Sequence, residues 1–193
     1  MRVERRSMMV AAVVALLLSP VGAQGQFSVG GGWSFPMGDF SDEAKTGWVG
    51  QVAYGFPVAA LPFRLRADVM YGDHRNVERE PSLYTRVGGE WFRQLGLNLN
   101  AVRELEMAVV RPYALLGVGV IREWHGDYSR SGTDHVNLRL NAGVGLNVPI
   151  SGRDGIFVEV RPLLLGKSLP LSLPAVHDEV RFQSVPILIG IRI

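Results

Sequence analysis

Apolar and polar residues alternate with a period of two through most of this chain, and this feature constrains its fold more than any other. In 136–148 an apolar residue occupies every second position, and Asn, Arg or Gly stands between them. Successive side chains of a β-strand point to opposite faces, so this period predicts strands with one apolar and one polar face. From residue 26 onward no segment has a helical period, so we expect an all-β fold.

The alternation predicts eight strands. They cover 27–35, 48–56, 63–71, 84–92 with pairing that continues to 99, 107–124, 136–148, 156–164 and 184–193. In 107–124 both parities are apolar, so the pattern assigns no faces there. Long polar or proline-bearing connections at 36–45, 73–83, 125–134 and 166–182 alternate with short turns at 58–62, 103–106 and 151–155. An even strand number with long loops at one end is typical of an antiparallel up-and-down transmembrane β-barrel.

Aromatic residues are expected to form two rings that flank aliphatic strand centres. The predicted short-turn end holds Phe27, Phe56, Phe63 and Tyr113. The predicted long-loop end holds Trp33, Phe35, Trp48, Tyr71, Tyr84, Trp124 and Phe182. Amphipathic rings of this kind are favoured at the two membrane–water boundaries.

The first 23 residues have the order of a secretory signal peptide. A basic start with Arg2, Arg5 and Arg6 precedes the apolar run Val10–Leu18, and Val21–Ala23 offers small residues for cleavage after Ala23. The alternative, an anchoring N-terminal helix, is disfavoured because a spanning helix needs about 20 apolar residues. We therefore expect a signal peptide at 1–23 and one barrel domain at 24–193.

Charge and cysteine content exclude several classes of function. Residues 1–23 hold three arginines and one glutamate, so the rest of the chain has equal numbers of basic and acidic residues. The basic character of a nucleic-acid-binding surface is therefore missing. The absence of cysteine excludes a disulfide scaffold, a thiolate metal site and a cysteine nucleophile.

Periodicity alone leaves two arrangements of the faces. A soluble, lipocalin-like barrel would put the apolar face inside, whereas a membrane barrel puts it outside. The apolar faces carry bulky Trp, Tyr and Phe, and the polar faces are rich in Gly, Ser, Asn and Ala, which suit a narrow lumen. We therefore expect the membrane arrangement, with the soluble periplasmic ligand-binding barrel as the alternative.

The chain resembles small bacterial outer-membrane β-barrels of the OmpA transmembrane-domain and OmpX type. The resemblance covers Gln26–Ile193 and rests on the signal peptide, the glycine-rich first strand that ends in Phe35–Phe40, Arg111–Tyr113 before Gly117–Gly119, and the closing Pro186–Ile193. The family's last strand usually ends in an aromatic residue, whereas this one ends in Ile193. The resemblance implies an integral outer-membrane protein and no particular activity.

The predicted inward face collects a cluster of charged residues. Its members are Arg64, Arg66, Asp68, Arg86, Glu90, Arg139, Glu159, Arg161 and Arg192. Glu104, Glu106 or Glu123 would offset the excess of arginines. Because an eight-stranded barrel is just wide enough for side chains to fill, we expect a closed lumen whose charges pair with each other. An ion path or an anion site is the alternative.

Two loops hold residue types that catalysis uses, but we predict no catalytic, metal or cofactor site. His125 with Asp127 and Ser129 lies in one loop, and His177 with Asp178 and Glu179 lies in another, near Ser168 and Ser172. Outer-membrane enzymes that modify lipid A use Ser/His/acid sets, so such an enzyme is the alternative. The remaining histidines, His74 and His135, share no metal-ligand spacing with these. Asp39, Asp42 and Glu43 in the first loop fit turn chemistry and solvated charge.

These inferences predict a monomeric outer-membrane barrel, with both termini periplasmic and no catalytic activity. Its role would be structural or a surface interaction through four long extracellular loops. Its expected partners are outer-membrane lipids, lipopolysaccharide and, during biogenesis, the barrel-assembly machinery.

Overall fold

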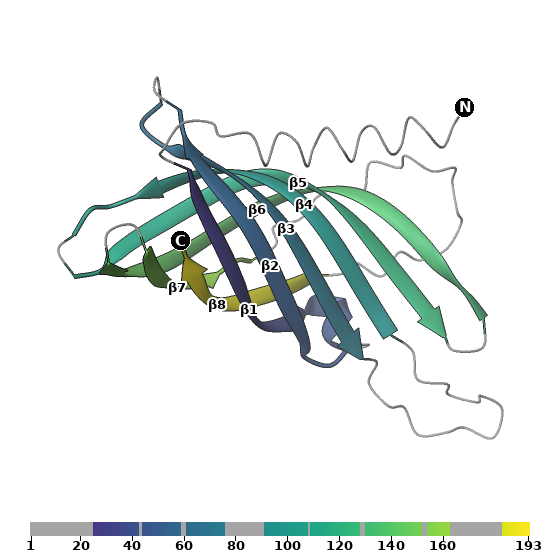
Figure 1. Ribbon diagram of the computed structural model, residues 1–193. Helices are drawn as coiled ribbons and strands as arrows, with labels where there is room; N and C mark the ends of the chain where they lie inside the picture. Colours follow the sequence, from purple (N-terminus) through teal and green to yellow (C-terminus); the bar gives the residue numbers. More distant parts are fainter. Residues whose placement is uncertain are drawn as a thin grey trace.

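The computed structural model is a closed barrel of eight antiparallel strands. It describes residues 25–42, 44–58, 61–75, 91–107, 109–127, 130–151, 154–162 and 183–193. The elements are β1 (Gln26–Met37), the 3-10 helix η1 (Gly38–Asp42), β2 (Gly47–Pro57), β3 (Arg64–Arg75), β4 (Trp91–Glu104), β5 (Arg111–Asp127), β6 (Arg130–Ser151), β7 (Asp154–Val160) and β8 (Gln183–Arg192). Each strand pairs with its neighbours in sequence, and β8 pairs with β1 (Figure 1). The predicted up-and-down all-β barrel is confirmed.

The two ends of the barrel sequence meet at the β1–β8 seam. Phe27 and Ile193 exchange backbone hydrogen bonds of 3.0 and 2.9 Å, so the last residue belongs to the ladder. Closure pairs β1 with β8, the two strands that would be the free edges of an open sheet. The expected signal peptide at 1–23 lies outside the described residues. Within the described ranges, no helix is long and apolar enough to span a membrane.

The apolar face of the barrel points outward. Large apolar side chains at least 40% exposed include Trp33, Trp48, Leu97, Leu140, Val144, Leu146 and Ile189. The residues between them face inward and include charged side chains that are almost fully buried, such as Arg161 and Glu159 at 0% exposure. A soluble barrel requires the opposite arrangement, so the lipocalin-like alternative is wrong for the faces of this chain.

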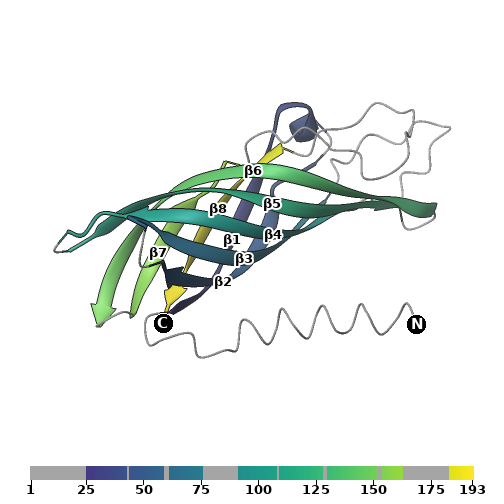
Figure 2. The ribbon, with the colours of Figure 1, turned by 90° about the horizontal axis from the view of Figure 1, so that it is seen from above.

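Two expectations about β5 and β6 need correction. The sequence placed a long loop at 125–134, but β5 and β6 pair as far as Asp127 and Arg130. The polar residues there continue a β-hairpin, which extends beyond the other strands at the end opposite the C-terminus (Figures 1 and 2). In β5 the odd-numbered residues face inward. Tyr113 is therefore buried at 4% exposure and does not belong to an outer aromatic ring.

Other sequence expectations fall partly outside the described ranges. The fourth strand begins at Trp91 in the structure, and the expected residues 84–90, with Tyr84, lie outside the described part of the chain. Phe182 and the loop 166–182 also lie outside it. The outward aromatic residues described at the long-loop end include Trp33, Trp48 and Tyr71, as the alternation predicted.

Candidate functional site

The middle of the barrel is filled by two arginines and two carboxylates. Arg66 from β3 donates two hydrogen bonds to Glu159 from β7, at 2.8 and 3.0 Å. Arg161 follows β7 and donates to Glu159 at 2.6 Å and to Asp68 at 2.9 Å. All four side chains are at most 7% exposed, and their formal charges cancel. Forked arginine–carboxylate pairs are among the strongest hydrogen bonds that proteins make, so this central network fixes β3 against β7 across the lumen.

Neutral side chains add hydrogen bonds to the two carboxylates of the central network. Asn98 and Asn100 on β4 donate to the two oxygens of Asp68, at 2.7 and 2.6 Å. The Tyr113 hydroxyl on β5 donates to Glu159 at 2.8 Å. The network therefore joins four strands, and its carboxylates have the partners that a buried charge requires.

Further ion pairs lie toward the two ends of the lumen. Toward the short-turn end, Arg192 on β8 donates to Glu104 on β4 at 2.9 Å and lies over the Tyr113 ring at 4.6 Å. Toward the long-loop end, Arg139 on β6 donates to Glu123 on β5, which also accepts a bond from Asn137. These charged residues therefore form layers along the barrel axis, and each layer contains both an arginine and a carboxylate that pair with each other.

The first long loop places one aromatic side chain inside its end of the barrel. Gly38 adopts a φ of 58°, a conformation that favours glycine, and turns the chain from β1 into η1. Phe40 is then buried at 1% exposure. Its ring makes edge contacts with His74 at 5.3 Å and with Phe92 at 5.4 Å. His74 is held in turn by the Lys45 carbonyl oxygen, 3.1 Å from its Nδ1. These three rings form an aromatic plug inside the barrel at its long-loop end.

Bulky inward side chains pack against inward glycines. Phe157 on β7 is 2% exposed, and a Cβ built on Gly30 would lie 2.7 Å from its Cζ atom. Near the opposite mouth, a cavity of about 20 Å³ is lined by Gln26, Arg64 and Arg192 among others, and has room for about one water molecule. The described interior is a packed core of polar and aromatic side chains.

Most of the predicted charge cluster faces the lumen in the structure. Arg64, Arg66, Asp68, Arg139, Glu159, Arg161 and Arg192 point inward, whereas Arg86 and Glu90 lie outside the described residues. Of the three candidate counter-charges, Glu104 and Glu123 make ion pairs and Glu106 is exposed in a turn. Sequence reasoning did not single out Asn98 and Asn100, although their alternation with Leu97 and Leu99 marks them as inward.

The candidate catalytic and metal residues lie on paired strands or outside the described part of the chain. His125 and His135 lie on the paired strands β5 and β6 and not in a loop. His74 is buried inside β3, against Phe40. His177, Asp178, Glu179, Ser129, Ser168 and Ser172 fall outside the described residues. Among the residues that are described, no three His, Cys, Asp or Glu side chains could hold a metal ion.

Comparison with a solved outer-membrane protein bears out the barrel fold. Neisserial surface protein A (NspA) superposes with a TM-score of 0.61 at 15% sequence identity, over 88% of this chain and 96% of that one. A major outer membrane protein from Thermus thermophilus gives 0.49 at 15%, over 87% and 98%. The N-terminal β-barrel domain of Pseudomonas aeruginosa OprF gives 0.48 at 11%, over 88% and 96%. No protein-family model and no curated protein matches the chain.

Proposed function

We propose that this chain is an integral outer-membrane β-barrel with a closed lumen, which acts through its outer surface and its long-loop end and carries out no catalysis. One observation carries the proposal: fully buried, mutually paired charges fill the inside of a barrel whose outside is apolar. Such a molecule is stable in a bilayer, where every backbone group must be paired within the protein. Its interior is occupied by structural side chains, which leaves the exposed ends for function.

The outward face also supports contact with anionic lipid on the long-loop side. On β4 the Arg93 guanidinium lies 4.3 Å from the centre of the Trp91 ring, and on β5 that of Arg122 lies 4.8 Å from Trp124. Arg93 stands directly opposite Trp124 in the ladder and also pairs with Asp73 at 3.0 Å. Arginine near a membrane boundary costs little and attracts phosphate. We assign this surface to the head groups of lipopolysaccharide, which places the long loops outside the cell and the termini in the periplasm.

Cell fractionation tests the proposed location. We expect the mature protein, cleaved after Ala23, in the outer membrane as a monomer. On SDS gels it should migrate differently before and after boiling, because a closed barrel resists the detergent until it is heated. Recovery in the soluble periplasm, with one mobility under both conditions, would contradict the proposal.

The proposed lack of catalysis has a separate test against the lipid A-modifying alternative. We expect the mass spectrum of lipid A to be the same after deletion, after overexpression, and in the His125→Ala and His177→Ala variants. A nucleophile must be held within hydrogen-bond reach of its base, and the sequence around His125 and His177 has no feature that fixes such a pair. A shift by one acyl chain that disappears in either histidine variant would make the protein an enzyme.

A further inference from the structure

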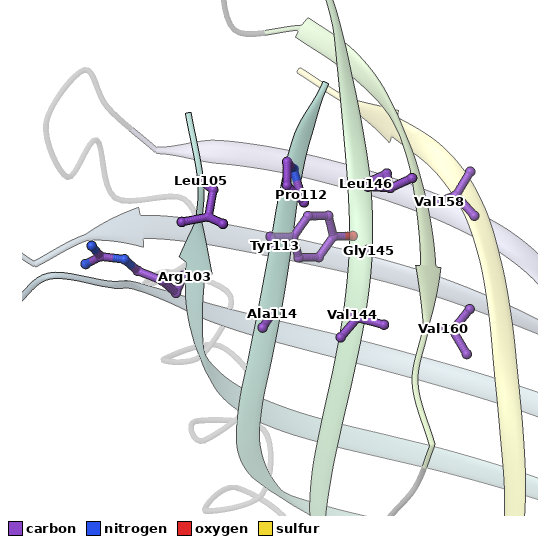
Figure 3. A pocket seen from close by; sticks show the side chains of 10 residues that line it. All are labelled: Arg103, Leu105, Pro112, Tyr113, Ala114, Val144, Gly145, Leu146, Val158 and Val160. Atoms are coloured by element: carbon purple, nitrogen blue, oxygen red, sulfur yellow. The ribbon is translucent and has the colours of Figure 1, made fainter. Parts of the chain in front are cut away.

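An apolar groove crosses the outside of the barrel over β4, β5, β6 and β7. Its volume is about 560 Å³, which is within the usual size of ligand pockets. In Figure 3 Arg103 lies at one edge, Val158 and Val160 lie at the other, and the small side chain of Ala114 lies between them. Most of the lining side chains are outward-facing and apolar, so the groove faces the medium around the barrel and not the lumen.

Strand register gives the direction of the groove. Arg103 pairs with Ala114, Ala114 with Val144, and Val144 with Val160. Beyond the groove the same row of paired residues continues to β8 and reaches Trp33 on β1, in the aromatic ring of the long-loop end. Arg103, by contrast, lies at the short-turn end. The row therefore climbs from one boundary of the apolar band toward the other, and the groove runs from Arg103 into that band.

Arg103 supplies a cation at the edge of the groove nearest the short-turn end of the barrel. Its guanidinium donates a hydrogen bond to the Pro62 carbonyl oxygen, in the turn between β2 and β3. Among the described residues it has no carboxylate within ion-pair distance, in contrast to Arg192 on the inside. A guanidinium presents five N–H donors in a planar fork that matches phosphate, and one carbonyl uses only part of that capacity.

We propose that this groove binds one phospholipid with a net anionic head group. The phosphate lies beside Arg103 at the short-turn boundary, and an acyl chain lies across Ala114 toward Val144 and Val160 (Figure 3). The apolar walls match the chain, and the Arg103 guanidinium, which has no carboxylate partner among the described residues, matches the head group. This inference rests on the proposed membrane location. It adds a defined lipid site on the outer surface that starts at the short-turn end, opposite the long loops.

The absence of cysteine from the chain allows a local test. A fluorophore is attached to a single cysteine at Val158→Cys, in the groove, or at Val52→Cys, an outward position on β2 that is outside it. The labelled barrels are refolded into phosphatidylcholine vesicles that contain acyl-brominated phosphatidylglycerol or acyl-brominated phosphatidylcholine. We expect the anionic lipid to quench the groove label with about fivefold stronger apparent association, the preference that one cation near a membrane surface provides. The label at residue 52 should show no preference.

Three further variants separate the site from general charge effects. Arg103→Gln should abolish the preference at the groove label, and Arg103→Lys should keep it. Arg93→Gln, on the same face of β4 at the other end, should leave it unchanged. Equal quenching by both lipids at Val158→Cys, or the same loss in Arg93→Gln as in Arg103→Gln, would overturn the proposal. Each barrel is also checked for its heat-dependent gel mobility. A wild type that never inserts would refute the membrane location as well, whereas insertion without preference would refute the lipid site alone.

Discussion

Glu159 shows how single residues hold the interior together. Its carboxylate accepts hydrogen bonds from Arg66, Arg161 and Tyr113 while the side chain is fully buried. Its removal would leave two buried guanidinium groups with one remaining carboxylate, Asp68, between them. An uncompensated buried charge is far more costly than the loss of an exposed pair, because water cannot replace the missing partner.

The Glu159→Ala variant should therefore lose about 3–5 kcal/mol of unfolding free energy. Asp73→Ala is the matched control, since it breaks the exposed pair with Arg93 and should cost about 0–1 kcal/mol. Urea titration of the refolded barrel in vesicles, followed by the heat-dependent gel shift, measures both. Similar midpoints for the two variants would show that the central network adds little to stability.

Gly30 and Gly31 are neighbours in sequence that face opposite sides of the barrel wall. A Cβ on Gly30 would meet Phe157 at 2.7 Å inside, whereas one on Gly31 would meet only the Val49 carbonyl oxygen, at 3.5 Å. Gly30→Ala should therefore destabilise the barrel by about 1–3 kcal/mol through overpacking, and Gly31→Ala should change its stability little. The same urea titration compares them, and equal effects would contradict the packed interior.

At the scale of the strands, sequence alternation predicts most of what the structure shows. It correctly predicted that the apolar faces of β1, β3, β6, β7 and β8 point outward. The period of two fixes the face of every residue in a strand, since a register shift of one residue would exchange the two faces. It assigned no faces in β5, where Leu115 and Leu116 are both apolar but only Leu115 is buried. It also took the polar residues of the β5–β6 hairpin for a loop, because strands that extend beyond an apolar band have no apolar face to reveal them.

Leu140 and Asn141 on β6 test the assignment of the two faces. Leu140 is 51% exposed on the outer face near the middle of the strand, and Asn141 is 1% exposed and donates to Asn98 at 3.3 Å. Leu140→Arg should cost about 2–4 kcal/mol and reduce insertion into vesicles, since it places a cation on the lipid face. Asn141→Ala should cost about 1 kcal/mol, the value of one hydrogen bond, and should insert normally. Equal insertion of the two variants would mean that the faces are reversed.

At the scale of the whole molecule, the pairing of the interior lies beyond sequence reasoning. Alternation identified inward charges, but the partners Arg66 and Glu159 are separated by 93 positions and meet only because β7 lies across the lumen from β3. The aromatic plug has the same origin, because Phe40, His74 and Phe92 come from three segments that only closure of the barrel brings together. The sequence therefore predicts a filled interior but not the contacts that fill it.

Conductance across planar bilayers tests most directly the claim that this barrel is closed. The central network, the ion pairs toward each end and the aromatic plug occupy the described lumen in series, so an ion would have to displace paired charges at each layer. We predict that the purified wild-type protein, inserted at high density as shown by its heat-dependent gel mobility, gives no steady current above that of the bare bilayer. Large and reproducible single-channel steps would contradict this account and would make the inward arginines part of an ion path.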